Sequence, residues 1–153
     1  MFDPVFSRIL VAYDGSEASK RALDTAAKMA AMFKGELLIL AVVPRVIIPI
    51  IATTELNTME LETQDYQEKL KEAYSLALDE AEKDMKEHYP HVNTEAILAE
   101  GRPSERIIEI SENKNASLIV IGSRGIGGIS GWILGSTSRK VVDHCTKPIL
   151  IVK

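Results

Sequence analysis

The 153-residue chain has few of the residues that build disulfides, zinc sites or aromatic cores. One cysteine and three histidines exclude an internal disulfide and leave no Cys/His zinc cluster. The near absence of cysteine suits a reducing compartment, so we expect a cytoplasmic protein. Only 5% of the residues are aromatic, so the core has to be aliphatic. The net charge of -4 argues against a dedicated nucleic-acid binder.

Export and membrane-spanning patterns are also missing. The first residues, MFDPVFSR, place Asp3 and Pro4 where the apolar stretch of a signal peptide would run. The longest uncharged stretch, residues 125–138, has 14 residues including five glycines, which is too short and too rich in glycine to cross a bilayer. With 46% hydrophobic and 26% charged residues, the composition is globular, and we expect a single domain over residues 1–153 with no membrane partner.

Short aliphatic runs alternate with helical patterns along the chain. Runs of this kind that end at turn residues are typical of buried parallel strands. Five occur, over residues 8–14, 36–43, 92–98, 118–122 and 148–152. Helices are predicted from Ser16 to Gly35, over 58–88, from Pro103 onward and over 136–144, with an apolar loop over 45–57.

Apolar spacing also predicts which side of each helix is buried. In the first helix the repeating positions are Ala22, Ala26, Met29 and Phe33. In the long helix one apolar face consists of Tyr66, Leu70, Ala73, Ala77, Ala81 and Met85.

This alternation predicts an α/β fold, an open five-stranded parallel sheet with helices on both faces, Rossmann-like. Among doubly wound arrangements we favour the strand order 3-2-1-4-5, which sets strands one and four side by side. A ligand crevice then opens between the carboxyl ends of those two strands, where Asp14 and Gly122 fall.

A glycine-rich segment, Gly122 to Ser138, carries the strongest chemical signal. Glycines let backbone N–H groups approach an anion closely, and a helix N-terminus favours phosphate. Residues 120–153 carry five Lys/Arg against one Asp/Glu, whereas residues 1–119 carry 13 against 21. The glycines could instead form only a flexible crossover. No Gly-Lys-Ser/Thr follows them, so the loop is not a Walker A motif, and no glycine fingerprint for a flavin or NAD follows strand one.

The spacing Gly122-x2-Gly125-x9-Gly135-Ser136 resembles the ATP-binding signature of the universal stress protein family. The opening ILVAYDGS and the closing PILIV resemble the first and last strands of the same family. The likeness covers essentially the whole chain.

The resemblance implies an ATP site, with Mg²⁺ held mainly by the phosphates. Asp14 and the backbone of Ala12 would contact the nucleoside, Val42 would lie against adenine and Gly122 beside the ribose. The phosphates would be surrounded by Arg124, Gly125, Gly135, Ser136 and Thr137, with Ser138 close by. The family also implies a homodimer formed through the last strand.

Several alternatives stay open at the level of sequence. Asp14 could simply cap the following helix, Ser136 is expected to cap the last helix in either case, and Cys145 is expected to face the core. No residue is nominated as catalytic. The favoured function is a nucleotide-dependent regulatory or stress-response protein, in which ATP orders the glycine loop for an unknown protein partner. A slow ATPase and a nucleotide-free dimeric interaction module are the alternatives.

Overall fold

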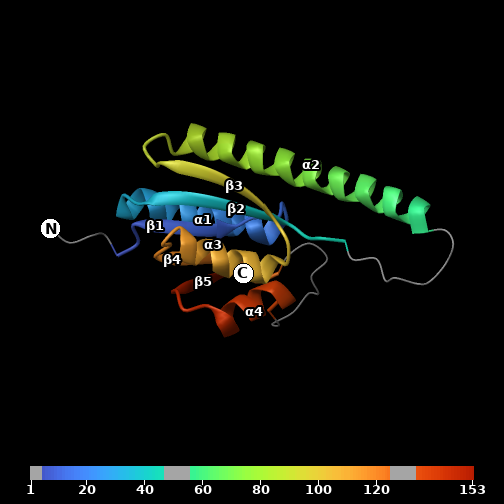
Figure 1. Ribbon diagram of the computed structural model, residues 1–153. Helices are drawn as coiled ribbons and strands as arrows, with labels where there is room; N and C mark the ends of the chain where they lie inside the picture. Colours follow the sequence, from blue (N-terminus) through green and yellow to red (C-terminus); the bar gives the residue numbers. More distant parts are fainter. Residues whose placement is uncertain (1–4, 47–55, 125–133) are drawn as a thin grey trace.

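The computed structural model describes residues 5–46, 56–124 and 134–153. Along the chain the elements are β1 (Arg8–Ala12), α1 (Glu17–Phe33), β2 (Glu36–Val43), α2 (Leu56–His88), β3 (Thr94–Glu100), α3 (Pro103–Asn113), β4 (Leu118–Gly122), α4 (Ser136–His144) and β5 (Ile149–Val152) (Figure 1). The regular alternation of strand and helix is the predicted one, and the segments 47–55 and 125–133 lie outside the described residues.

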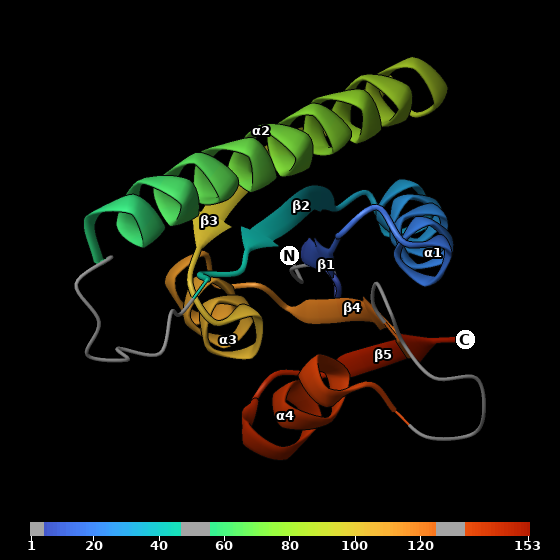
Figure 2. The same cartoon turned by 90° about the vertical axis from the view of Figure 1, so that its right-hand side faces the viewer.

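The five strands form one parallel sheet in the order β3-β2-β1-β4-β5, which confirms the predicted order. Figure 2 shows α1 and α2 on one face of the sheet and α3 and α4 on the other. Side chains alternate between the two faces: Ile9 and Val11 of β1 pack in the core under α1 and α2, whereas Leu10 packs in the core under α3 and α4. Both faces of the central strands are therefore buried, as expected for parallel strands.

The connection from α1 to β2 depends on two unusual backbone positions. Lys34 ends α1 in the left-handed conformation, with φ 54°. Gly35 follows, and a Cβ atom at this position would lie 2.4 Å from the carbonyl oxygen of Phe6. Glycine is therefore required here for a close backbone approach, while Lys34 supplies the positive φ that ends the helix.

Several element boundaries differ from the prediction. β1 ends at Ala12 because the backbone N–H of Asp14 turns to the Ser19 hydroxyl, 3.3 Å away. β3 is shifted to Thr94–Glu100, since Val92 is held in a turn by its N–H bond of 3.0 Å to the Tyr89 carbonyl. α2 begins at Leu56, two residues before the predicted start.

The predicted face of α2 is confirmed in its last part, where Ala81 and Met85 are buried beside Leu78 and Ala77 packs against the core. The prediction is wrong in the first part, where Tyr66 is 56% exposed and Ala73 is also exposed. Tyr74 is half-buried and packs against the core under α1 and α2. Figure 1 shows the first part of α2 running beyond the ends of β2 and β3, so a residue near that end has no sheet to cover. Among the described helices, no segment is long and apolar enough to span a bilayer.

Candidate functional site

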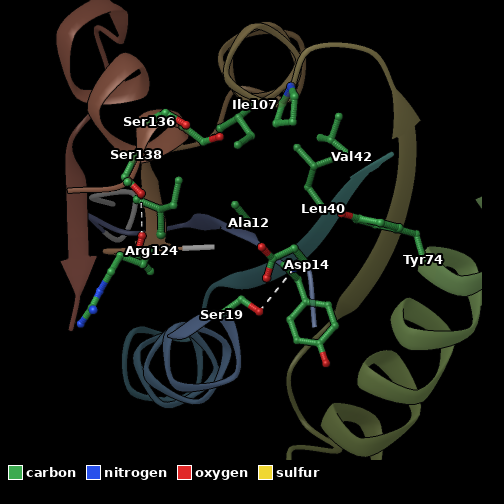
Figure 3. A pocket seen from close by; sticks show the side chains of 16 residues that line it. Ala12, Asp14, Ser19, Leu40, Val42, Tyr74, Ile107, Arg124, Ser136 and Ser138 are labelled. Atoms are coloured by element: carbon green, nitrogen blue, oxygen red, sulfur yellow. Dashed lines mark hydrogen bonds between the residues drawn. The ribbon is translucent and has the colours of Figure 1, made fainter. Parts of the chain in front are cut away.

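A cavity of about 310 Å³ opens at the carboxyl ends of the central strands. Its floor comes from residues at the ends of β1, β2 and β4, and its walls come from α2 and the N-terminal turns of α3 and α4 (Figure 3). The residues that line it are Ala12, Tyr13, Asp14, Ser19, Leu40, Val42, Tyr74, Pro103, Ile107, Ile121, Gly122, Arg124, Gly135, Ser136, Thr137 and Ser138.

Nine of the ten residues nominated from the sequence line this one cavity. They come from segments far apart in the chain, namely Ala12 and Asp14, then Val42, then Gly122 and Arg124, and finally residues 135–138. The tenth, Gly125, lies outside the described residues. The sheet order explains the convergence, because it places the carboxyl ends of β1, β2 and β4 side by side.

Asp14 lies in the turn between β1 and α1 and does not cap the helix. Ser16 is the N-cap, and its hydroxyl accepts from the Ser19 N–H at 3.2 Å. A carboxylate oxygen of Asp14 accepts from the Ser16 N–H at 2.9 Å, which fixes the turn. Figure 3 shows the carboxylate facing the interior of the cavity. Asp14 thus presents acceptor atoms to whatever occupies this space.

Gly122 joins the cavity to the packing of α1. A Cβ atom at Gly122 would lie 3.0 Å from the backbone and the side chain of Ala18 in α1. A side chain here would therefore push α1 away from the end of β4. The predicted site glycine is also a packing glycine, which the sequence pattern did not distinguish.

At the start of α4 the prediction of the cap was wrong. Gly135 is the N-cap, so the exposed Ser136 is the first helical residue. Glycine has no side-chain oxygen for the first-turn N–H groups, and the N-cap makes no side-chain cap bond. Ser138 is 3% exposed, and its hydroxyl donates to the Gly122 carbonyl at 2.7 Å. Ser138 therefore ties α4 to the end of β4.

The family model described as the universal stress protein family matches residues 6–153. The chain belongs to the universal stress protein family. A relative in this family is the universal stress protein YxiE of Bacillus subtilis, which is 36% identical over 155 residues, covering 97% of this chain and all of that protein.

Solved structures of universal stress proteins share the fold. UspA from Lactobacillus plantarum superposes with a TM-score of 0.83 at 21% identity, covering 97% of this chain and 98% of that one. A universal stress protein solved in complex with cAMP gives 0.64 at 24% identity over 96% of each chain. A universal stress protein from Archaeoglobus fulgidus, solved with dAMP, gives 0.63 at 21% identity over 97% and 99% of the two chains.

In this universal stress protein the cavity also has walls that sequence reasoning missed. Leu40 lies beside Ala12 because the two residues are register partners in β2 and β1. Ile107 of α3 also lines the cavity, and it was not nominated as a site residue. Tyr74 comes from α2, and no local signal marked it. Burial raises the pKa of the Tyr13 and Tyr74 phenols, so both are protonated at neutral pH.

The remaining predictions concern Arg124 and Cys145. Arg124 contributes to the edge of the cavity, and Figure 3 shows its guanidinium directed away from Asp14. Cys145 is half-buried against the core under α3 and α4, and its sulfur accepts from the Lys147 N–H at 3.3 Å. Within residues 5–46, 56–124 and 134–153, no cluster of three or more His, Cys, Asp or Glu residues is arranged to hold a metal ion.

Proposed function

We propose that this universal stress protein binds an adenine nucleotide, ATP, in the cavity at the carboxyl end of its sheet. The observation that carries the proposal is the convergence of nine nominated residues, from four separate parts of the chain, on one cavity. A volume of about 310 Å³ is at the lower end of the range for small-molecule sites.

The nucleoside is assigned to the apolar half of the cavity. Leu40, Val42 and Ile107 supply aliphatic surface from β2 and α3, against which a purine ring can pack. The carboxylate of Asp14 lies next to this surface and can accept hydrogen bonds from ribose hydroxyls. Solved relatives crystallised with cAMP and with dAMP support the choice of an adenine nucleotide.

The phosphates are assigned to the start of α4. The first-turn N–H groups of α4 have no side-chain cap from Gly135, and a helix N-terminus attracts anions. Ser136 and Thr137 add hydroxyl donors, and residues 120–153 carry a net charge of +4. Magnesium would be held mainly by the phosphates, and it would neutralise part of their charge.

The proposal also includes a homodimer and a protein partner whose binding depends on the nucleotide. β5 lies at the edge of the sheet, and its residues Ile149–Val152 are all partly exposed. An exposed apolar edge strand is a pairing surface, which supports a homodimer through β5. We propose that nucleotide occupancy regulates recognition by a protein partner, with any hydrolysis slow.

The first test is to denature the purified protein and identify released nucleotide by chromatography, followed by titration with ATP. Released ATP, or micromolar binding on titration, supports the proposal. A protein that carries no nucleotide and binds none on titration contradicts it and favours the dimeric interaction module. Single-turnover assays with labelled ATP then separate a binding protein from the slow ATPase.

A charge variant locates the phosphates. Thr137→Glu puts a carboxylate at the second residue of α4, where a negative charge is favourable for the helix but repels phosphate. We expect roughly a 10-fold or greater loss of ATP affinity without loss of stability. Gln64→Glu adds the same charge at an exposed position of α2 outside the cavity lining; it is the control and should leave affinity unchanged. Equal ATP affinities of Thr137→Glu and the wild type would contradict the assignment of the phosphates to the start of α4.

A further inference from the structure

Among the described residues, Tyr74 is the one that the long helix α2 contributes to the cavity lining. The other lining residues come from the ends of strands, the turn into α1 and its first helical turn, and the helices α3 and α4. Figure 3 shows the Tyr74 side chain reaching from α2 toward Leu40 of β2, with the hydroxyl at its leading end. Tyr74 therefore closes the side of the apolar half of the cavity that the sheet and α3 leave open.

Polar contacts hold α2 in register over the carboxyl ends of β2 and β3. The Gln67 amide donates to the Pro44 carbonyl at 3.1 Å and accepts from the Val46 N–H at 3.0 Å. The ammonium of Lys71 lies 2.9 Å from a carboxylate oxygen of Glu100, the last residue of β3. Gln67, Lys71 and Tyr74 are spaced i, i+4 and i+7, so they share one side of the helix. The two tethers thus fix the direction in which Tyr74 points.

The phenol of Tyr74 is suited to donate a hydrogen bond into the cavity. Its burial, and next the negative charge of Asp14, raise its pKa above the ordinary 10.0, so it keeps its proton at neutral pH. Among the described residues, the Tyr74 hydroxyl has no hydrogen-bond partner. Asp14 and Tyr74 therefore offer an acceptor and a donor on the same apolar half of the cavity.

We propose that Tyr74 is a ligand-binding residue, whose ring packs against the nucleoside of the bound nucleotide and whose hydroxyl donates to it. This inference rests on the proposed function, and it makes α2 part of the binding site. A contact to the nucleoside is shared by AMP and ATP, whereas a contact to the outer phosphates is made by ATP alone.

The test is a calorimetric titration of AMP and of ATP into the wild type, Tyr74→Phe and Tyr74→Leu. Tyr74→Phe removes only the hydroxyl, and we expect affinity for both nucleotides to fall by the same factor, roughly 3- to 10-fold. Tyr74→Leu also removes the ring, and its loss should be larger, on the order of 30-fold for both ligands. Tyr66→Phe, on the same helix but 56% exposed, is the matched control and should bind as the wild type does.

The outcomes separate this inference from the proposed function. Equal losses for AMP and ATP in Tyr74→Phe support the nucleoside contact. Unchanged affinity for both, or a loss for ATP with none for AMP, overturns it while the nucleotide site stands. A wild type that binds neither nucleotide overturns both. Because Tyr74→Phe is the smallest change to the core side of α2, it keeps the test valid if Tyr74→Leu does not fold.

Discussion

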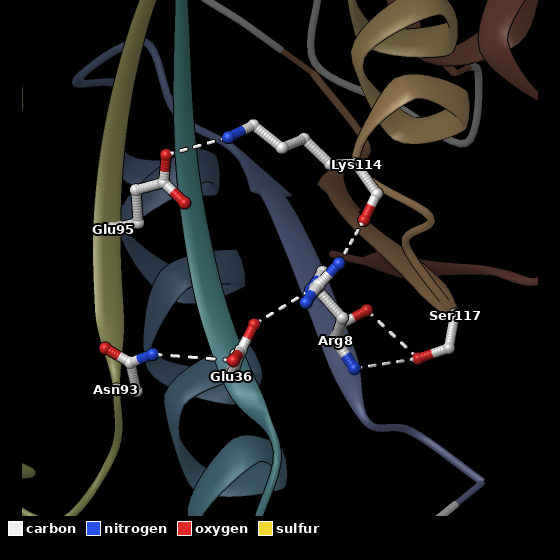
Figure 4. Close-up of polar contacts among 6 residues, drawn as sticks. All are labelled: Arg8, Glu36, Asn93, Glu95, Lys114 and Ser117. Carbon is white, nitrogen blue, oxygen red and sulfur yellow. Dashed lines mark hydrogen bonds and ion pairs between the residues drawn. The ribbon is translucent and has the colours of Figure 1, made fainter.

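The two ends of the sheet use polar residues in opposite ways. At the amino end, charged side chains bind one another and the backbone (Figure 4). Arg8 is the register partner of Glu36, and their side chains form an ion pair of 2.8 Å. A guanidinium nitrogen of Arg8 also donates to the Lys114 carbonyl at 2.7 Å, and Ser117 bonds to both the N–H and the carbonyl of Arg8 at 3.0 Å. Further contacts join Asn93 to Glu36 and Lys114 to Glu95.

At the carboxyl end, the described residues surround a cavity with backbone, hydroxyls and aliphatic side chains. Asp14 and Arg124 are the charged residues among its described lining. The difference follows from topology, because every strand-to-helix connection in a parallel α/β fold lies at this end and directs helix N-termini toward it. The amino end therefore stabilises the sheet, and the carboxyl end keeps an open cavity for the proposed nucleotide.

The largest effect should come from filling the close contact at the amino end. Gly35→Ala places a Cβ 2.4 Å from the Phe6 carbonyl oxygen, a backbone atom that can move only if β1 moves. We expect the free energy of unfolding to fall by about 3 kcal/mol, as measured by urea denaturation. Lys34→Gly is the matched control, and because Lys34 has φ 54° it should be neutral or slightly stabilising. An alanine variant as stable as the wild type would show that this turn relaxes freely.

The second-largest effect on stability should distinguish two serines of the cavity, the buried Ser138 and the exposed Ser136. Ser138→Ala removes a buried hydroxyl that donates to the Gly122 carbonyl at 2.7 Å, so it should lower the free energy of unfolding by about 1–2 kcal/mol. Ser136→Ala removes an exposed hydroxyl and should change stability by less than about 0.5 kcal/mol while weakening ATP binding. Urea denaturation and calorimetric titration of both variants measure the difference. Similar stability losses in the two would contradict the structural role of Ser138.

The contrast between the two ends also explains what the sequence could predict. The strands and helices follow from local patterns, because parallel strands have unbroken apolar runs, and the strand order was a choice among doubly wound arrangements. Most of the nominated lining residues came from the resemblance of the glycine spacing, which lies within one segment, to a family signature. Tyr74 could not be predicted, since its place in the cavity depends on how α2 crosses the sheet and on tethers from Gln67 and Lys71 to distant segments. The first part of the α2 face was misassigned for a similar reason, because that part of the helix runs beyond the ends of β2 and β3 and Tyr66 is exposed.

Helix caps and close backbone contacts were also not predictable from the sequence. Ser136 has the residue type of an N-cap, yet the backbone places Gly135 there. The choice depends on the Gly135 N–H, which donates to the Ser123 carbonyl at 2.7 Å across the site. The packing role of Gly122 was missed for a similar reason, since its contact with Ala18 is made between elements more than 100 residues apart. Such contacts carry no local pattern.

The third prediction breaks the amino-end network without touching the site. Arg8→Met removes the ion pair with Glu36 and the bond to the Lys114 carbonyl. Both side chains of the pair are more than a third exposed, so the free energy of unfolding should fall by only about 1 kcal/mol, as measured by urea denaturation. Lys28→Met, which removes a more exposed ion pair with Asp24 on α1, should lower the free energy of unfolding less, and both variants should bind ATP as the wild type does. Reduced ATP affinity in Arg8→Met would show that the two ends are coupled.

The smallest expected effect on stability comes from the Tyr74 phenol at the carboxyl end of the sheet, and it arises only at alkaline pH. Burial raises the pKa of Tyr74 in the folded protein, so above pH 10 the unfolded chain releases this proton while the folded chain keeps it. The folded state then binds more protons, and its stability falls as pH rises through this window. Tyr74→Phe removes this contribution, so its free energy of unfolding should decrease less than that of the wild type between pH 9 and 11, measured by urea denaturation. The exposed Tyr66→Phe is the control and should follow the wild type. Parallel curves for Tyr74→Phe and the wild type would mean that the phenol is as well hydrated at the carboxyl end of the sheet as in the unfolded chain.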